Sequence, residues 1–410
     1  MSTTTGVHAL VRRTHEERVL GVLRERGALS RGEIAALVGL SRTTLSEITS
    51  SLLERGAIIV VDTDADLREG SGRPAERLAL DPDSGQFMGV DFGHRRVNVV
   101  IADAAHEVIA SGTARYTEEA EWPERLTSAF DLIERVGAES GIHLGALQAI
   151  GIGVPGPFVS HQSLAKRELW GSRKLAFGVD VAFSERYSAA VIIDNNTRFA
   201  ALAEAIRSSG GAVNDLVYIR ISDGVGGGLV VGGRLIMGSV GLAGELGHVT
   251  VERNGRRCRC GKDGCLETVA SVPAILAACR ARGVDVNSLD ELDIEVKRGQ
   301  PIVDAVLRDV GSAIGIAVGS AAMALNPSLI VIAGAITRIA PAIVHYAAST
   351  IQFELWPIPD AAPTVRASEL GDDDGAIGAV AALFHQSPLL VGYPEPASTA
   401  RSPQPQRSSS

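Results

Sequence analysis

Cysteines and aromatic residues are scarce in this chain, and no long apolar run is uninterrupted. Four cysteines in 410 residues are too few for a disulfide-stabilised scaffold, and aromatic residues account for only 4%. The most apolar stretch, 313–336, is broken by Gly315, Gly319 and Pro327, so we expect a buried helix followed by a strand and not a membrane span. The first residues lack the basic and apolar regions of a signal peptide. We therefore expect a cytoplasmic protein without a membrane segment.

Common nucleotide-binding motifs are also missing. The glycine run 224–228 does not have the spacing of the dinucleotide fingerprint, and 255–263 misses the P-loop in gap length and final residue. Neither a Rossmann cofactor site nor a Walker-type ATPase is indicated. The net charge of −9 lies outside residues 1–80, where eleven arginines balance eleven acidic residues. DNA binding by this segment therefore requires its arginines to gather on one face.

Three short helical patterns follow one another near the N-terminus. Capping-box spacing occurs at Thr14 with Glu17 and at Ser30 with Glu33. Only Gly39-Leu40 separates the second pattern from the third, which is the tight turn of a helix-turn-helix. The apolar residues expected to face the core are Val19, Leu20, Leu23, Ile34, Leu37, Val38, Leu45, Ile48 and Leu52.

The third helix and the hairpin after it are typical of a winged helix-turn-helix. Two apolar runs, 58–61 and 77–80, predict paired strands around a polar tip that contains 70–74. The outward face of the helix also carries Glu47 and Thr49. A protein-interaction module is the alternative reading of the same pattern. The side chains expected to contact DNA are Ser41, Arg42, Thr43, Thr44, Ser46 and, at the tip, Arg73.

Beyond the turn-rich junction 81–85, strands and helices alternate, which predicts an α/β domain. A strand–turn–strand pattern occurs twice, at 86–102 and 216–231, and this indicates two similar halves with a cleft between them. Further helices are expected at 122–139, 197–207 and 301–325. The expected domains are a disordered start at 1–9, the DNA-binding domain at 10–82, the large domain at 86–385, and a disordered Pro/Ser-rich tail at 386–410.

One imidazole and three thiols have the spacing of a zinc site. His248, Cys258, Cys260 and Cys265 form a Cys₃His set, and flanking glycines would let the backbone fold back around one ion. Four protein ligands leave no open position, so we expect one structural Zn²⁺ per chain. Free thiols in an apolar core are the alternative, which the neighbouring arginines disfavour. Cys279 lies in an apolar helical run and is expected in the core.

These motifs together resemble the ROK family of repressors and sugar kinases. The resemblance rests on Glu245-Leu-Gly-His248, on the cysteine segment 258–267, and on the proline-glycine-proline loop 151–157. The front module, with its Gly72-Arg73-Pro74 wing, is similar to that of the family's transcriptional repressors. The resemblance implies an actin-like (sugar kinase/ribonuclease H-like) fold, a duplicated α/β unit with a cleft.

The resemblance also implies a sugar site. The family's sugar-binding positions correspond to Asn195, Asn196, Glu245, His248 and Glu267, whose carboxylates and amides suit a polyol. His248 would then bind zinc with one ring nitrogen and face the sugar with the other. Alternatively, Glu245 and Glu267 only orient the zinc ligands.

Several departures from the kinase pattern predict that the chain is not an enzyme and does not bind ATP. Asn196 stands at the position of the catalytic base, and an amide cannot accept a proton at neutral pH. Asp194 lies two residues away, and a rescue role for it stays open. The segments compared with the family's phosphate and adenosine loops, 91–95, 222–224 and 333–335, have gained bulky or acidic residues or lost glycines.

The sequence thus predicts a DNA-binding transcriptional regulator whose degenerate kinase domain senses a sugar or sugar derivative. Its expected partners are an inverted-repeat operator in double-stranded DNA and a second copy of the chain, as a homodimer or homotetramer. The main alternative is a bifunctional sugar kinase that also binds DNA. Thr197 and Arg198 are unusual residues at this position of the site. They leave open whether the ligand is anionic and whether the site has lost ligand binding.

Overall fold

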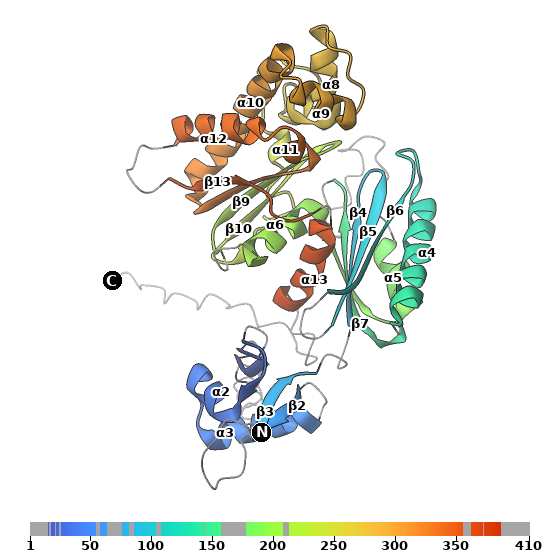
Figure 1. Cartoon of the computed structure of the whole chain (residues 1–410), viewed down its shortest axis with the longest axis vertical. Helices are drawn as coiled ribbons and strands as arrows, with labels where there is room; N and C mark the ends of the chain where they lie inside the picture. Colours follow the sequence, from blue (N-terminus) through green and yellow to red (C-terminus); the bar gives the residue numbers. More distant parts are fainter. Residues whose placement is uncertain are drawn as a thin grey trace, which may run out of the picture. The chain divides into compact units, whose positions relative to one another are not determined.

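A computed structural model of the chain contains two compact units, one with Met1–Ser84 and the chain end from Phe384, the other with Gly85–Leu383. Each unit is considered by itself (Figure 1). None of the helices in the described part of the chain has both the length and the apolar character needed to cross a lipid bilayer. The described residues are 15, 18–20, 22–23, 26–54, 58–63, 76–81, 86–103, 108–142, 144–156, 178–207, 213–355, 362–371 and 373–386.

The N-terminal unit combines two described helices with a small antiparallel sheet of strand order β1-β3-β2. The helix α2 packs against α3 and against β3. The two helices are separated by the short turn that the sequence predicts, and the hairpin β2–β3 follows them. The elements are β1 (Leu29–Ser30), α2 (Arg31–Val38), α3 (Arg42–Glu54), β2 (Ile58–Thr63) and β3 (Glu76–Leu80).

Local signals in this unit are confirmed where the structure describes them. Ser30 and Glu33 form a complete capping box at the start of α2. Gly39 ends that helix with φ of 66°, a conformation that favours glycine. Thr14, Glu17 and Arg73 lie outside the described residues, so the first capping box and the wing arginine stay predictions.

Two side chains of this unit do not lie where the sequence predicts. Leu37 is half exposed, because Ile34 and Val38 share the buried face of α2 and Leu37 lies at its edge. Thr49 is fully buried, because it follows Leu45 by one helical repeat and therefore shares its inward face. The Thr49 hydroxyl donates to the Leu45 carbonyl at 2.9 Å and accepts from Arg31 Nε at 3.2 Å.

The larger unit contains two five-stranded mixed sheets with the same topology. In each, three consecutive antiparallel strands are followed by two strands that extend the sheet in parallel from the first of them, so β6-β5-β4-β7-β8 corresponds to β11-β10-β9-β12-β13. The duplicated α/β architecture expected from the sequence is therefore confirmed. The strands are β4 (Gln86–Phe92), β5 (Arg96–Asp103), β6 (Val108–Arg115), β7 (Leu147–Val154), β8 (Ala190–Asn195), β9 (Leu216–Ile221), β10 (Val225–Val231), β11 (Arg234–Leu235), β12 (Leu329–Ala333) and β13 (Thr364–Ala367).

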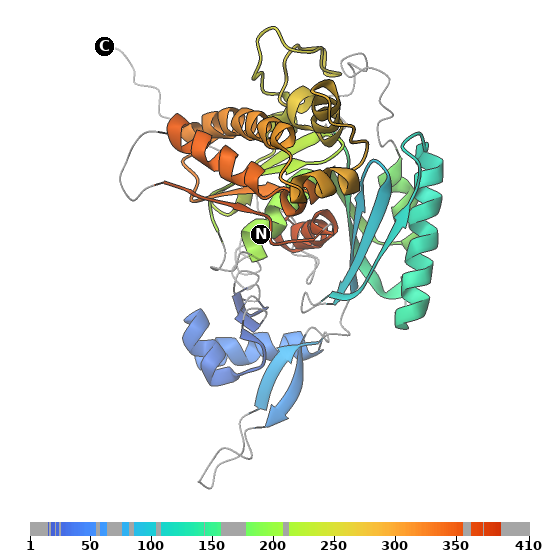
Figure 2. The same cartoon turned by 45° about the horizontal axis from the view of Figure 1, so that its top comes forward.

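Helices cover both sheets and fill the space between them. In the first half, α4 covers one face of the sheet and packs on β5 and β6 (Figure 2). Between the halves, α6 packs on the second sheet and α13 on the first, and the two helices approach closely at Gly378 and Phe199. The helices are α4 (Trp122–Ser140), α5 (Val179–Tyr187), α6 (Asn196–Arg207), α7 (Glu267–Ala270), α8 (Val272–Ala281), α9 (Leu289–Lys297), α10 (Pro301–Leu325), α11 (Ala335–Ile339), α12 (Ala342–Glu354) and α13 (Asp374–Gln386), with 3₁₀ turns η3 (Leu144–Ala146) and η5 (Leu246–His248).

Candidate functional site

A cavity of about 360 Å³ lies between the two halves of the larger unit. It is bounded by the carboxyl ends of β4, β7, β8 and β9 and by the turns that follow them, which is where α/β folds commonly bind ligands. The three segments that the sequence compares with phosphate and adenosine loops meet here through Gly93–Arg95, Ser222–Gly224 and Gly334–Ala335.

All five predicted sugar-binding residues line this cavity. Asn195 and Asn196 stand at the junction of β8 and α6, Glu245 and His248 at η5, and Glu267 at the start of α7. The fold therefore brings these five residues to one cavity, and their role in sugar binding stays a prediction. The roles that these residues can take depend on the hydrogen bonds that their polar atoms already make within the protein.

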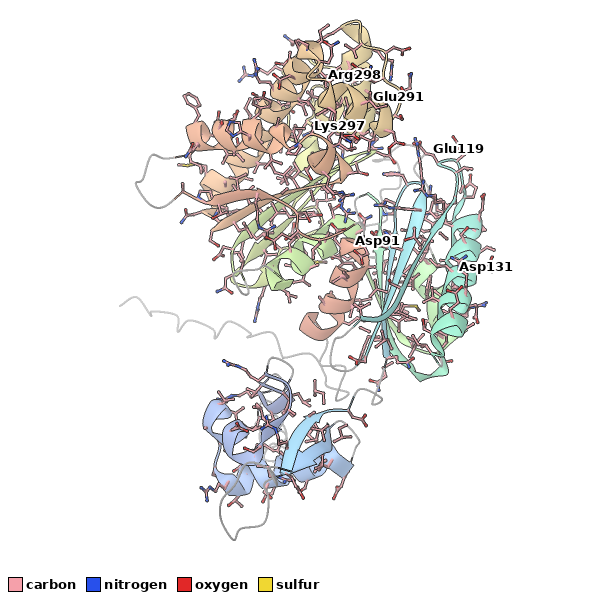
Figure 3. All side chains as sticks on the ribbon, in the orientation of Figure 1. Asp91, Glu119, Asp131, Glu291, Lys297 and Arg298 are labelled. Carbon is pink, nitrogen blue, oxygen red and sulfur yellow. The ribbon has the colours of Figure 1, made fainter. Side chains whose placement is uncertain are left out.

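The two asparagines have much of their hydrogen-bonding capacity engaged within the protein. Asn195 Oδ1 accepts from the Thr197 and Arg198 backbone N–H groups at 2.8 and 3.2 Å and so caps α6. Asn196 Nδ2 donates to Asp91 Oδ1 at 2.9 Å and to the Phe92 carbonyl at 3.1 Å. Asn196 thus holds the start of α6 against the end of β4, where Asp91 is labelled in Figure 3.

Glu267 links the cavity to the cysteine segment. Its Oε2 accepts from Arg259 Nη2 at 2.6 Å and from the Val225 backbone N–H at 3.1 Å. A Cβ at Gly224 would lie 2.8 Å from Glu267 Oε2, so a larger residue there would make the end of this side chain shift. Glu267 therefore ties the loop between Cys258 and Cys260 to β10, which fits an orienting role as well as a sugar-binding one.

Asp194 and Arg198 form a buried ion pair that does not line the cavity. Both side chains are almost completely inaccessible, and Arg198 also donates to the Gly241 carbonyl in the segment that leads to Glu245. Burial raises the pKa of the Asp194 carboxyl, and the charge of Arg198 opposes that shift. The suggestion that Arg198 attracts an anionic ligand is wrong, because its guanidinium is engaged inside the fold.

A second network of buried and part-buried side chains crosses between the halves, and no pattern in the sequence indicates it. On β9, Arg220 pairs with Asp374 of α13, and its Nη1 lies 4.0 Å from Asp91 Oδ2 on β4. Tyr218 donates to Asp374 Oδ2 at 2.6 Å. The partners are more than 120 residues apart in the chain, so no local pattern could reveal them. Arg220 places a fixed positive charge between two carboxylates on the cavity wall.

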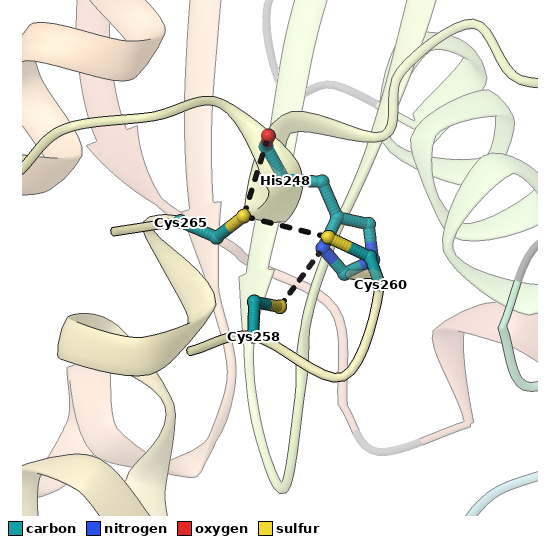
Figure 4. Close-up of side chains that lie close together, drawn as sticks. All are labelled: His248, Cys258, Cys260 and Cys265. Carbon is teal, nitrogen blue, oxygen red and sulfur yellow. Dashed lines mark hydrogen bonds between the residues drawn. The ribbon is translucent and has the colours of Figure 1, made fainter. Parts of the chain in front are cut away.

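The four predicted metal ligands lie together (Figure 4). Their donor atoms are all within 4.8 Å of one another, with 3.6 Å from Cys258 Sγ to His248 Nδ1 and 3.5 Å from Cys260 Sγ to Cys265 Sγ. Tetrahedral zinc with Zn–S of about 2.3 Å requires ligand atoms about 3.8 Å apart, so the arrangement fits such an ion.

The backbone and the thiols of this cluster also suit a metal. Gly261 and Gly264 have φ of 92° and 69°, as the predicted fold-back requires, and a Cβ at Gly264 would collide with the Glu252 carbonyl. Burial, with the neighbouring thiols, raises the pKa of Cys265 to about 12. A cation bound at this cluster would stabilise the thiolate form of Cys265. Cys279 is buried in the core, as predicted.

Comparison with known proteins gives consistent results. The profile of the ROK family matches residues 87–387. The xylose repressor of Caldicellulosiruptor bescii is 28% identical over 80% of this chain and 84% of its own length. The DNA-binding transcriptional dual regulator NagC of Escherichia coli is 29% identical over 91% of this chain and 92% of its own.

Solved structures of a regulator and of a kinase resemble different shares of the chain. A ROK family transcriptional regulator, described as a homologue of the E. coli MLC protein, matches with a TM-score of 0.74 and 25% identity over 90% of this chain and 95% of its own. The ROK hexokinase of Thermus thermophilus matches with a TM-score of 0.59 and 26% identity over 72% of this chain and 97% of its own. The regulator thus resembles more of the chain than the kinase does.

Proposed function

Because the chain belongs to the ROK family, we propose that it is a sugar-responsive transcriptional repressor that binds DNA through its N-terminal unit. The observation that carries this proposal is that one chain combines two units. The N-terminal unit has two helices followed by a hairpin, and the larger unit that follows in the sequence is a duplicated α/β unit with an internal cavity. The names of the relatives, a xylose repressor and a transcriptional regulator, support the same role. Such a role takes place in the cytoplasm.

The N-terminal unit serves in this proposal as a winged helix-turn-helix within residues 10–82, and the effector domain spans 86–385. The short turn after Gly39 and the sheet β1-β3-β2 support this assignment. On α3, Arg42, Thr43 and Ser46 are exposed and available to base edges or phosphates. Ser41 Oγ instead accepts from the Thr44 backbone N–H at 3.2 Å and shares a 2.8 Å hydrogen bond with the Thr44 hydroxyl, so this pair mainly stabilises the start of the helix.

Arg42→Ala is expected to weaken binding to the operator by about 1–3 kcal/mol and to relax specificity at one position of each half-site, because a side chain that reads a base edge is lost. Fluorescence anisotropy with the operator and with single-base variants of it measures both effects. Arg135→Ala, an exposed arginine on α4 of the larger unit, is the control for loss of one positive charge. Equal binding by wild type and Arg42→Ala would contradict the proposed recognition helix.

The operator in this proposal is an inverted repeat read by a homodimer or homotetramer. A single small DNA-binding module without excess positive charge binds weakly, so two copies are needed for useful affinity. The half-sites should lie about 34–36 Å, or a multiple of that distance, apart. Footprinting of the full chain with and without sugars tests this: a protected site with two-fold symmetry, changed by a sugar, supports the repressor, and an asymmetric site contradicts it.

We also propose that the larger unit does not phosphorylate sugars. Asn196 is held by Asp91 and the Phe92 carbonyl and offers no group that accepts a proton. Loss of a general base alone costs about 10²–10⁴ in rate. Asp194, the other candidate, is committed to Arg198 and does not line the cavity. The bifunctional kinase is the alternative that this geometry disfavours.

Accordingly, no ATP-dependent phosphorylation of sugars by the wild-type protein is expected in a coupled assay. Asn196→Asp should not create a kinase, since the new carboxylate would face Asp91 at hydrogen-bonding distance and the two like charges would repel. Its melting temperature should fall for the same reason. Asn195→Asp, at the neighbouring position that does not contact Asp91, is the comparison variant. Robust turnover by the wild type would favour the bifunctional kinase.

A structural zinc ion completes the proposal. Its ligands would be His248, Cys258, Cys260 and Cys265. The ion would cross-link η5 to the cysteine segment and would take no part in a reaction of a substrate. A ligand role for His248 Nδ1 would leave Nε2 as the nitrogen that meets a sugar hydroxyl. Arg259, in the loop between Cys258 and Cys260, donates a hydrogen bond to Glu267, and both side chains line the cavity. The metal site would therefore help to hold the wall of the effector site in place.

A further inference from the structure

One arginine in the N-terminal unit joins three elements of the fold. Arg31 is the first residue of α2, and its guanidinium donates to Thr49 Oγ1 on α3 at 3.2 Å and to Glu76 Oε2 on β3 at 2.6 Å. The partners lie eighteen and forty-five residues away along the chain. Arg31 therefore links the start of one helix both to the helix proposed to read DNA and to the hairpin that follows it.

The contact with Thr49 bears on how α3 is rotated about its own axis. Arg42, Ser46 and Thr49 follow one another at intervals of four and three residues, so they form one stripe along the helix. Arg42 and Ser46 are exposed, whereas Thr49 is fully buried. A rotation of α3 that moved the Thr49 hydroxyl away from Arg31 would also turn Arg42 and Ser46 out of their present direction.

The hydrogen bonds of the Thr49 hydroxyl differ in what they specify. The hydroxyl donates to the Leu45 carbonyl at 2.9 Å, and its oxygen accepts from Arg31. A buried hydroxyl costs free energy unless it is hydrogen-bonded, and the bond to Leu45 meets this need within α3 itself. That bond would form at any orientation of the helix. The bond from Arg31, which comes from another element, depends on the orientation.

The charge of Arg31 is engaged within the N-terminal unit. A cation is unfavourable at the start of a helix, where the helix dipole is positive, and the Glu76 carboxylate offsets this cost. Glu76 pairs with Thr63 in the register of the hairpin, so the contact joins the start of α2 to both of its strands. Such a partly exposed ion pair adds little stability. Its main effect is to fix the position of the guanidinium.

We propose that Arg31 is a positioning residue for DNA recognition. Through Thr49 it fixes the rotation of α3, and through Glu76 it holds that helix against the hairpin. Side chains on α3 then face the bases without a search for the right orientation, and preorganisation of this kind raises affinity and specificity. The inference rests on the proposed role of the N-terminal unit in binding DNA, and it concerns residues that need not touch the DNA.

Fluorescence anisotropy with the full chain tests the proposal. The probes are the double-stranded sequence that the wild type selects from random DNA and the single-base variants of that sequence. Thr49→Val keeps the size of the buried side chain and removes its hydroxyl, whereas Thr49→Ser keeps the hydroxyl. Thr49→Val is expected to weaken binding about fivefold or more and to reduce discrimination against at least one variant about threefold or more. Thr49→Ser should stay within about twofold of the wild type.

The choice of Thr49 makes the result specific. Because its side chain is fully buried, it cannot touch DNA, and a change in base discrimination must arise through the position of α3. A role in stability alone would lower the fraction of protein able to bind and leave the discrimination of the remaining protein unchanged. Titration at DNA concentrations well above the dissociation constant measures that fraction, and far-ultraviolet circular dichroism monitors the helices.

Arg31→Met separates positioning from a direct contact with the DNA backbone. It should reduce discrimination as Thr49→Val does, and it should weaken binding less when Arg42→Ala has already removed the base contact that it positions. The slope of log affinity against log salt should stay within about 0.5 of the wild-type value, whereas loss of a phosphate contact would change it by about one. Arg135→Met, which removes an exposed arginine of the larger unit, should bind as the wild type does.

Two outcomes would overturn the proposal. One is base discrimination that is unchanged in both Thr49→Val and Arg31→Met. The other is a loss in Arg31→Met that adds fully to that of Arg42→Ala and comes with a salt slope shifted by about one, since Arg31 would then bind a phosphate itself. A wild type that selects no sequence would refute the proposed function together with this inference, whereas selection by the wild type with unaffected variants refutes the inference alone.

Discussion

Replacing Arg198 by methionine is expected to lower the free energy of unfolding of the larger unit by about 3–5 kcal/mol. The substitution keeps an apolar side chain of similar length but leaves the Asp194 carboxylate buried without its cation. It also removes the hydrogen bond to the Gly241 carbonyl. Denaturant unfolding followed by tryptophan fluorescence measures the loss for this unit alone, since Trp122, Trp170 and Trp356 all belong to Gly85–Leu383.

A double-mutant cycle separates the ion pair from the other contacts of Arg198. Asp194→Asn combined with Arg198→Met should be less destabilised than the sum of the single variants, because no buried charge then remains unpaired. Arg186→Met is the control: Arg186 pairs with Glu134 on the surface, where such pairs contribute about 1 kcal/mol at most. Additive effects in the cycle would mean that the pair is not coupled as its geometry implies.

Features that depend on local sequence were predictable in this protein. Ser30 and Glu33 lie three residues apart and Gly39 ends the same helix, so caps and turns could be read directly. The cluster of His248 with three cysteines was predictable because the cysteines lie within eight residues and the backbone there has the glycines that a tight loop needs. The repeated strand–turn–strand pattern revealed the duplication for the same reason, since each copy is encoded in a short segment.

Two kinds of feature were not predictable: which face of a helix packs against the rest of the protein, and which residues form pairs that only the folded chain brings together. Thr49 has a polar side chain on a face that the sequence predicts to be outward, yet it is buried and accepts a hydrogen bond from the half-buried Arg31, eighteen residues earlier. Arg198 follows the asparagines so closely that the sequence leaves a contact with the ligand open, whereas in the fold it pairs with Asp194, four residues earlier. The contact between Arg220 and Asp374 spans 154 residues and arises only when the two halves assemble.

The proposed absence of kinase activity is supported by contacts of Asn196 that the sequence does not reveal. The sequence alone marks Asn196 as a missing base. In the folded chain its amide donates to Asp91, and Arg220 lies on the other side of that carboxylate. The polar groups at the end of β4 are thus satisfied by the protein itself. Restoring one catalytic residue would disturb this arrangement before it restored any chemistry.

The second large effect is expected at the metal centre. Protein purified without chelator should contain one zinc per chain, and Cys260→Ser should remove it, because a hydroxyl is a poor substitute for a thiolate ligand. Metal binding free energy contributes directly to folding, so the larger unit should lose several kcal/mol of stability and melt at a clearly lower temperature. Elemental analysis and thermal unfolding followed by tryptophan fluorescence measure the two effects on the same sample.

Cys279→Ala is the matched control, since Cys279 is the one cysteine outside the cluster and lies in the apolar core. It should retain the zinc and lose only the modest stability associated with a small change in packing. Chelation of the wild type should reproduce the Cys260→Ser melting curve, because both remove the same cross-link between η5 and the cysteine segment. Metal-free protein with an unchanged melting temperature would contradict a structural zinc site, and the buried thiols would then have to be explained as ordinary core residues.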